Sequence, residues 1–435
     1  MTTRLRDGIA LSSAVAMGLG ISTGYPLAMM AAAGMPVACL ASGTRKSAFQ
    51  SAFCYYMAAF WPVLPGLDRY IGRGATFATP LAIWVLAAIL LSLPWTLAAT
   101  SDHLQCVWRA PLALLATVIP PLGIIGVASP LTAAGYLFPG TAWAGIAAVA
   151  LTPGILLATK ALPLRRRYGI RCFAIALCIG LAIYGRCLRS GEAEAPRGWV
   201  AVNTHLADVS QPFRDFVAAQ FIQQTAAGSS ARVLIFPEAV VPRWSDATQA
   251  FWRQSLDRCR ARGQILAIGA GMPARSRSTE DEGNRFTDLK LYDFGAAIDA
   301  LRTMDTTPLR LIQAKQSPEP TDNTMLVVGA ESATFFQRIP VPVGMWRPFG
   351  RTSVPLRLTA PGVLTIDHQR AAVLICFEQM LTFPVLISML QHPTVIIGIS
   401  NTFWVDGTPI PRYQATALRG WAKLFRLPCF LAVNS

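Results

Sequence analysis

The chain has 435 residues, of which 53% are hydrophobic and 14% charged, and its formal net charge is +15. This composition is too apolar for an ordinary soluble enzyme and predicts a membrane-spanning portion. Residues 1–195 hold 14 Lys/Arg against 5 Asp/Glu, and residues 196–435 hold 24 against 18. Most of the excess charge therefore follows the positive-inside rule, and no basic helix or arm indicates direct nucleic-acid binding.

Hydrophobic runs follow one another through the first 190 residues. The first, at residues 8–42, is broken near residues 23–26. Further candidate spans lie at residues 47–66, 74–99, two within 110–159, and 173–185. Most reach the roughly 20 residues that a helix needs to cross the hydrocarbon core. We predict a transmembrane domain of about seven helices over residues 1–190, and so many apolar segments favour an uncleaved first span over a signal peptide.

The basic residues of the short connections predict the orientation of this domain. If seven helices alternate in direction, ten basic residues fall on one side, and only Arg69 and Arg73 fall on the other. The ten are Arg4, Arg6, Arg45, Lys46, Arg109, Lys160, Arg165, Arg166, Arg167 and Arg171. Basic connections stay in the cytoplasm. We therefore expect a bacterial inner-membrane protein with a cytoplasmic N-terminus, a linker at residues 191–198, and a periplasmic domain at residues 199–435.

After residue 198 short apolar runs alternate with helical segments. Strands are predicted at residues 199–202, 233–236, 265–269, 325–328, 373–375, 395–399 and 430–433. Helices are predicted at residues 212–224 and, with Ser245 as N-cap, as far as Arg262. Alternating strands and helices favour an α/β domain whose functional site lies at strand ends.

Two strands end on residues that can carry chemistry. Residues 363–367 and 371–375 form a predicted hairpin, and its second strand runs directly into Cys376 and Glu378. Another apolar run ends on Glu238, whose partial burial is expected to raise its pKa towards neutrality. A cysteine nucleophile with a glutamate general base requires such a pair. On spacing alone, a small buried structural cysteine is an equally good interpretation.

These stretches resemble the nitrilase superfamily of carbon–nitrogen hydrolases, and within it the membrane-embedded apolipoprotein N-acyltransferases. The resemblance covers nearly the whole chain and rests on the order of short motifs: Phe-Pro-Glu around Glu238, Asn-Thr-x-Leu-Val-Val-Gly at 323–329, Val-Pro-x-Gly at 341–344, Ile-Cys-Phe-Glu at 375–378 and Ser-Asn-x-x-Trp at 400–404. The segment FFQRIPVPVGMWRPFG at 335–350 is similar to the TraB family of conjugal-transfer proteins from rhizobial and Agrobacterium-type plasmids. The resemblance implies an α-β-β-α sandwich for the second domain.

The same resemblance implies roles for individual residues. Cys376 would form an acyl thioester, Glu238 would act as general base, and Glu378 would support the site. A segment that shapes the pocket includes Asn401 and Trp404, for which loop and core roles are an equal alternative. Phe377 stands where the acyltransferases carry a tyrosine, beside the nucleophile and in the pocket.

One essential residue of the resembled family is missing. Its lysine, whose ammonium stabilises the oxyanion, corresponds to Gln337, which can donate only a neutral hydrogen bond. Arg338 carries a charge one residue along, although successive strand residues point to opposite faces. Lys315 is a weaker substitute, and Met345 replaces a glutamate of the acyltransferases.

Two classes of function therefore stay open. As an enzyme, the protein would transfer or hydrolyse an acyl group in plasmid conjugation, with a membrane lipid as possible acyl donor and conjugation or envelope proteins as possible partners. As a scaffold without catalysis, it would bind or assemble components of the conjugation apparatus. A Cys–His hydrolase is a weaker alternative, because neither His368 nor His392 is placed as a base. Nine cysteines without a Cys-x-x-Cys pair argue against zinc, and we expect no cofactor.

Overall fold

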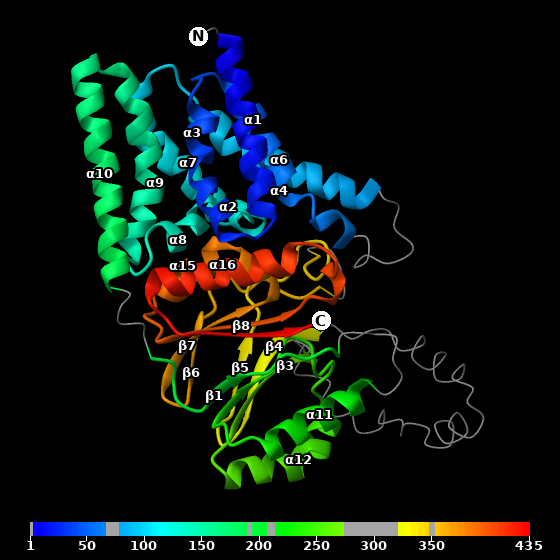
Figure 1. Ribbon diagram of the computed structural model, residues 1–435. Helices are drawn as coiled ribbons and strands as arrows, with labels where there is room; N and C mark the ends of the chain where they lie inside the picture. The colour runs from blue at the N-terminus through cyan, green and yellow to red at the C-terminus, as the bar shows by residue number, and fades with distance from the viewer. Residues whose placement is uncertain (1–2, 67–77, 189–193, 207–213, 274–320, 348–352) are drawn as a thin grey trace.

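A computed structural model describes residues 3–66, 78–188, 194–206, 214–273, 321–347 and 353–435. A helix bundle forms one end of the molecule and an α/β domain forms the other (Figure 1). Arg69, Arg73, Lys315 and part of the expected linker lie outside the described residues, so the predictions made for them stay predictions.

Nine α-helices of the described residues build the bundle. They are α1 (Thr3–Ser22), α2 (Pro26–Ala31), α3 (Met35–Leu40), α4 (Arg45–Phe60), α6 (Ala78–Ala98), α7 (Cys106–Val118), α8 (Ala134–Leu137), α9 (Trp143–Ala158) and α10 (Leu164–Leu188). The break predicted near residues 23–26 is present between α1 and α2, and Pro26 opens α2 as its first residue. By length and composition, three helices among the described residues could cross a membrane: Ala78–Ala98, Trp143–Ala161 and Leu164–Cys187. The predicted number of about seven spans stays a prediction.

The N-terminus of the chain lies at the end of the bundle that is away from the α/β domain (Figure 1). Arg6 donates to the carbonyl of Ser42 at 3.2 Å, and Lys160 donates to the carbonyl of Ala41 at 2.8 Å. These carbonyls follow the C-terminus of α3, where the helix dipole favours a cation. Segments far apart in the sequence thus bring their positive charges to one end of the bundle.

The α/β domain contains two sheets. The first has the order β1 (Trp199–Ala201), β2 (Val233–Ile235), β3 (Ile265–Pro273), β4 (Thr321–Gly329) and β5 (Ala333–Phe336), with β1–β3 parallel and the rest antiparallel. The second has the order β6 (Val363–Ile366), β7 (Gln369–Ile375), β8 (Val395–Asn401) and β9 (Cys429–Asn434), with β6 antiparallel to β7. The predicted strands and hairpin are confirmed, whereas β5 was not expected.

Helices cover the outer face of each sheet. α11 (Arg214–Gly228) and α12 (Asp246–Ala261) cover the first sheet, and Ser245 caps α12 as predicted by accepting from the Thr248 amide. α15 (Thr382–Met389) and α16 (Ile410–Phe425) cover the second. The core between the sheets joins residues such as Val233 and Val373. The domain is therefore the α-β-β-α sandwich that the resemblance implied.

The bundle packs on the α15–α16 side of this sandwich. One continuous core contains Tyr55 and Trp95 of the bundle together with Leu381, Tyr413 and Trp421 of the α/β domain. The helix layer on the second sheet is thus buried on both of its faces (Figure 1).

Candidate active site

Cys376 sits at a sharp turn directly after β7, at the start of the 3-10 helix η6 (Cys376–Met380). Its φ of +49° lies in the left-handed region, which is unfavourable for a residue with a side chain and is held only by surrounding structure. The side chain is buried, and its thiol lies 4.0 Å from the carbonyl oxygen of Asn401 at the end of β8. The backbone therefore presents the thiol at the end of the second sheet.

Glu238 follows β2 at the end of the first sheet and is also buried. Its Oε1 accepts from the Asn323 side chain at 2.5 Å, and its Oε2 accepts from the Asn401 amide at 2.8 Å. Gly269 of β3 allows this placement, because a Cβ there would lie 2.1 Å from the carbonyl oxygen of Pro237. The carboxylate is thus fixed by both sheets.

The Glu238 carboxylate and the Cys376 thiol meet at the main chain of Asn401, where the carboxylate accepts from the amide and the thiol lies against the carbonyl. Burial raises the pKa of Glu238, while hydrogen bonds from Cys376, Asn323 and Asn401 oppose the rise. Burial raises the pKa of Cys376 well above its usual range, and the charge of Glu238 raises it further. A thiol of raised pKa beside an ionisable carboxylate suits proton removal during attack rather than a preformed thiolate.

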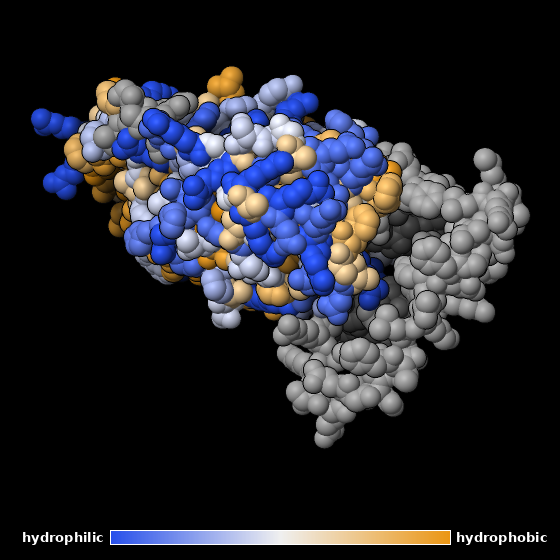
Figure 2. Space-filling model, turned by 90° about the horizontal axis from the view of Figure 1, so that it is seen from below, coloured by the Kyte–Doolittle hydropathy of each residue, from blue (hydrophilic) through white to orange (hydrophobic). Residues whose placement is uncertain are grey.

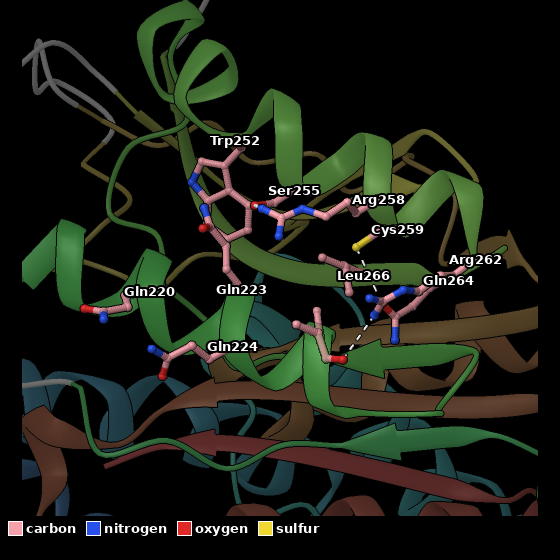
Figure 3. A pocket seen from close by; sticks show the side chains of 12 residues that line it. Gln220, Gln223, Gln224, Trp252, Ser255, Arg258, Cys259, Arg262, Gln264 and Leu266 are labelled. Carbon is pink, nitrogen blue, oxygen red and sulfur yellow. Dashed lines mark hydrogen bonds between the residues drawn. The ribbon is translucent and has the colours of Figure 1, made fainter.

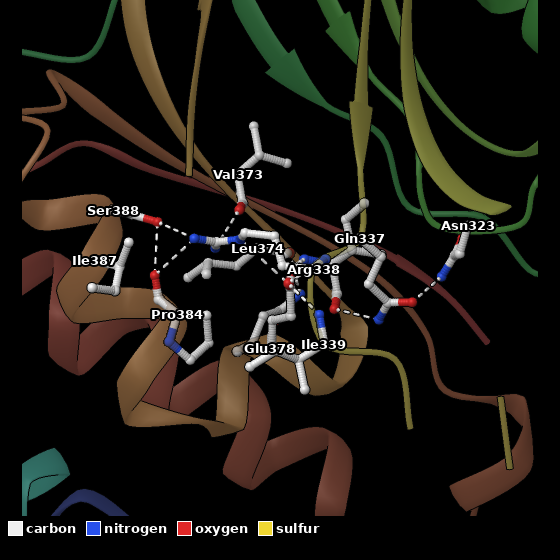
Figure 4. Close-up of polar contacts among 12 residues, drawn as sticks. Asn323, Gln337, Arg338, Ile339, Val373, Leu374, Glu378, Pro384, Ile387 and Ser388 are labelled. Atoms are coloured by element: carbon white, nitrogen blue, oxygen red, sulfur yellow. Dashed lines mark hydrogen bonds and ion pairs between the residues drawn. The ribbon is translucent and has the colours of Figure 1, made fainter. Parts of the chain in front are cut away.

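Gln337 lies in the middle of the site and is fully buried. Its Oε1 accepts from Asn323 at 3.0 Å, and its Nε2 donates to the carbonyl of Ile375 at 3.1 Å (Figure 4). The side chain therefore links the partner of Glu238 to the residue before Cys376. Its amide is engaged in holding the two sheets together.

Arg338 points the other way, so the idea that it replaces the missing lysine is wrong. Its Nη1 donates to the Pro384 carbonyl and the Ser388 hydroxyl, both at 3.1 Å, and its Nε lies 3.4 Å from Glu378 Oε1 (Figure 4). Gln337, by contrast, contacts Asn323 and the Ile375 carbonyl at the end of β7. These two successive side chains therefore face opposite sides, and the Arg338 cation faces α15.

Glu378 is completely buried, and both of its oxygens are occupied. Oε1 accepts from the amides of Arg338 at 2.8 Å and Ile339 at 3.1 Å, and Oε2 accepts from the amide of Ile375 at 2.9 Å. Burial raises the pKa of Glu378, and the neighbouring guanidinium opposes the rise. Its contacts allow a supporting role beside the site rather than proton transfer to a substrate.

The three residues expected to shape the pocket lie in two different places. Phe377 and Trp404 line an apolar cavity of about 50 Å³ between the bundle and the α/β domain, whose other walls include Ile21 and Phe60. Asn401 instead lies at the thiol, where its main chain contacts Glu238 and Cys376. The cavity adjoins the nucleophile's turn through Phe377.

Two residues of the site were missed from the sequence. Asn323 belongs to the Asn-Thr-x-Leu-Val-Val-Gly motif, but no role in the site was predicted for it from the sequence. A polar Asn at the start of an apolar strand could have pointed to one. Gln414 donates its side-chain amide to the Cys376 carbonyl at 2.6 Å. Gln414 lies on α16, a helix that was not predicted. Its position as a polar residue on a strongly apolar helix face could have indicated a buried contact.

A larger groove of about 260 Å³ lies elsewhere, between α11 and α12 (Figure 3). Gln220, Gln224, Trp252 and Arg258 are among its walls, and Arg262 donates to the Ala227 carbonyl at 3.1 Å. It contains none of the predicted site residues. Within the described ranges, no cluster of three His, Cys, Asp or Glu side chains is placed to hold a metal.

Comparison with known proteins gives two relatives over most of the chain. The chain is 27% identical over 446 residues to the probable conjugal transfer protein TraB of Sinorhizobium fredii, covering 97% of this chain and 94% of that protein. It is 28% identical over 398 residues to the conjugal transfer protein TraB of Agrobacterium fabrum, covering 88% and 78%.

Among solved structures, the chain is similar to an amidase from Nesterenkonia at 13% identity, with a TM-score of 0.32 over 55% of this chain and 78% of that one. A mutant of the Nesterenkonia AN1 amidase, of the nitrilase superfamily, gives 12% identity and a TM-score of 0.29 over 47% and 67%. No family model matches the chain. The similarity to TraB conjugal-transfer proteins expected from residues 335–350 is confirmed over nearly the full length of the chain.

Proposed function

We propose that the protein is a membrane-bound, nitrilase-like component of plasmid conjugal transfer that transfers or hydrolyses acyl groups through a Cys376 thioester. The names of the two relatives support the role in conjugation. The chemistry rests on one observation: Glu238 and Cys376, from the ends of two different sheets, are both buried against the main chain of Asn401.

The reaction begins with attack of the Cys376 sulfur on the carbonyl carbon of an acyl donor. Glu238 takes the thiol proton as the S–C bond forms, and it returns that proton to the leaving group as the old bond to the carbonyl breaks. Water or an amine then attacks the thioester carbon and loses a proton to Glu238. The C–S bond breaks, and Glu238 returns the proton to the sulfur, which regenerates the thiol. This sequence yields hydrolysis with water and acyl transfer with an amine.

The helix bundle supports a multi-pass location in the inner membrane. Three of its described helices are long and apolar enough to span a bilayer, and basic groups such as Arg6 and Lys160 gather at the far end. The positive-inside rule then favours a cytoplasmic N-terminus and a periplasmic α/β domain. The apolar cavity beside Phe377 lies on the bundle side of the Cys376 turn, from which a lipid-borne acyl donor would approach, with an envelope or conjugation protein as acceptor.

The second candidate is a nitrilase-like scaffold that binds or assembles other components without catalysis. Two contacts favour it: the Gln337 amide is bound to Asn323 and Ile375, and the Arg338 cation faces α15. Losing one preorganised donor to an oxyanion typically costs about 2.7–4 kcal/mol, which would slow acylation strongly.

Intact-mass measurement separates the two candidates. The parent, Cys376→Ala and the matched control Cys259→Ala are purified in detergent, incubated with phospholipid, and weighed before and after neutral hydroxylamine. The proposed enzyme gives an acyl-sized adduct on the parent and on Cys259→Ala that hydroxylamine removes. No adduct on the parent, together with normal plasmid transfer by Cys376→Ala, would establish the scaffold instead.

A further inference from the structure

Helix α16 lies between the bundle and the turn that carries Cys376 (Figure 1). The Tyr136 hydroxyl of α8 donates to the carbonyl of Thr416 at 2.8 Å. Gly135 and Gly420 bring the two backbones so close that a Cβ at Gly135 would lie 2.0 Å from the Gly420 carbonyl oxygen. The bundle therefore fixes the position of α16 through main-chain contacts.

A buried line of hydrogen bonds continues from the bundle to the nucleophile. The Tyr55 hydroxyl of α4 donates to the Ala128 carbonyl at 2.8 Å, and the Ala128 amide donates to the Tyr413 hydroxyl at 3.0 Å. The next residue, Gln414, donates to the carbonyl of Cys376 at 2.6 Å. All five residues are at most 5% exposed.

The last of these bonds acts on an unfavourable backbone conformation. Cys376 has a φ of +49°, and its buried carbonyl receives the Gln414 amide. Removing the Gln414 donor takes away one of the hydrogen bonds that hold this buried carbonyl, and the turn then gains by relaxing towards water or another partner. The direction of the thiol follows from the conformation of this turn.

We infer that Gln414 is a positioning residue that holds the Cys376 turn in its reactive conformation, and that Tyr413 makes this hold depend on the helix bundle. The inference rests on the proposed function only in naming Cys376 as the nucleophile. It assigns the bundle a direct part in the geometry of the site, beyond anchoring the protein.

The test measures how fast Cys376 reacts with iodoacetamide in the full-length protein, by peptide mass spectrometry across a range of pH. Gln414→Met keeps the side-chain length and removes the donor, and Tyr413→Phe removes only a hydroxyl that does not touch Cys376. Arg419→Ala, at an exposed position of the same helix, is the control variant. Cys259, buried behind the first sheet, is the reference thiol in every digest.

A loosened turn admits water, which makes Cys376 more accessible and lowers its pKa towards the ordinary value. We expect Gln414→Met to react at Cys376 about tenfold faster than the parent, with the pH profile shifted to lower pH. Tyr413→Phe should shift both quantities less in the same direction, while Cys259 is unchanged in every variant. Acyl-adduct formation, if the parent shows it, should become slower in both variants.

Unchanged Cys376 rates in Gln414→Met and Tyr413→Phe would overturn the inference. Equal acceleration at Cys376 and Cys259 would also overturn it, because that result reports general loosening of the fold. The alkylation measurement needs no catalytic turnover. A parent protein without an acyl adduct would contradict the proposed function, while the alkylation rates would still decide whether Gln414 positions the Cys376 turn.

Discussion

The two helix layers of the sandwich have the same architecture but opposite surroundings. The α11–α12 layer faces outward, and seen from below the molecule is mostly hydrophilic there (Figure 2). The α15–α16 layer is enclosed between the second sheet and the bundle, with Leu418 and Trp421 almost fully buried. Polar groups in the outer layer can bind water, whereas each polar group in the enclosed layer needs a protein partner. Substitutions should therefore have much larger effects in the enclosed layer.

Arg338→Met should give the largest effect, because it leaves the buried Glu378 carboxylate without its cation. Breaking a buried ion pair on one side typically costs about 3–5 kcal/mol in unfolding free energy. Thermal unfolding in detergent measures the loss. Arg258→Ala, on the exposed side of α12, should change stability by less than about 0.5 kcal/mol. Equal losses in the two variants would remove the contrast between the layers.

Gln337→Lys should give the second-largest effect, which is on the activation barrier of the reaction rather than on stability. A cation at the centre of the site would stabilise an oxyanion, a contribution of about 2.7–4 kcal/mol or roughly a hundredfold to a thousandfold in rate. The rate of acyl-adduct formation on Cys376 is the measurement. Gln264→Lys, at a buried glutamine behind the first sheet, controls for the burial of a new charge. No gain over the parent would count against catalysis at this site.

Gly269→Ala should cost about 1–3 kcal/mol and displace Glu238, because the new methyl group meets the Pro237 backbone. The midpoint temperature of unfolding and the rate of adduct formation on Cys376 should both fall. Gly228→Ala is the matched control, since a Cβ there meets nothing within 4 Å. A stable, fully reactive Gly269→Ala protein would show that this close approach does not fix the carboxylate.

The smallest effect concerns pH. Burial raises the pKa of Glu238 in the folded protein above the usual 4.5, so the folded state binds the proton more tightly than the unfolded state. The contribution of Glu238 to stability is complete below about pH 4.5 and is lost as the pH rises through the raised pKa. Thermal unfolding from pH 4 to 8 should show this decline in the parent and a flatter profile in Glu238→Gln. Identical profiles would show that Glu238 titrates normally.

Local sequence signals predicted the strand ends well and the enclosed layer badly. Apolar runs ending on Glu238 and Cys376 correctly placed both side chains at the ends of strands, because a strand fixes where its next residue lies; their reactivity stays a prediction. The orientation of Arg338 followed from strand alternation, yet its charge suggested a catalytic role that the alternation excludes. Helix α16 escaped prediction because its apolar face packs on distant parts of the chain, and so did the contact between Gln414 and Cys376. Contacts between residues that far apart leave little trace in any local pattern.

The close approaches of backbone at Gly24 with Tyr413, and at Gly135 with Gly420, also bear on how the two halves evolve. A Cβ at Gly24 would lie 2.4 Å from the Tyr413 amide nitrogen, and one at Gly135 would lie 2.0 Å from the Gly420 carbonyl oxygen, so the bundle tolerates no added side chain at either position. Exchange of the helix bundle for that of a relative would therefore yield a working protein only if the incoming bundle carried glycine at both of its positions. The bundle and the sandwich are thus constrained to change together at this joint.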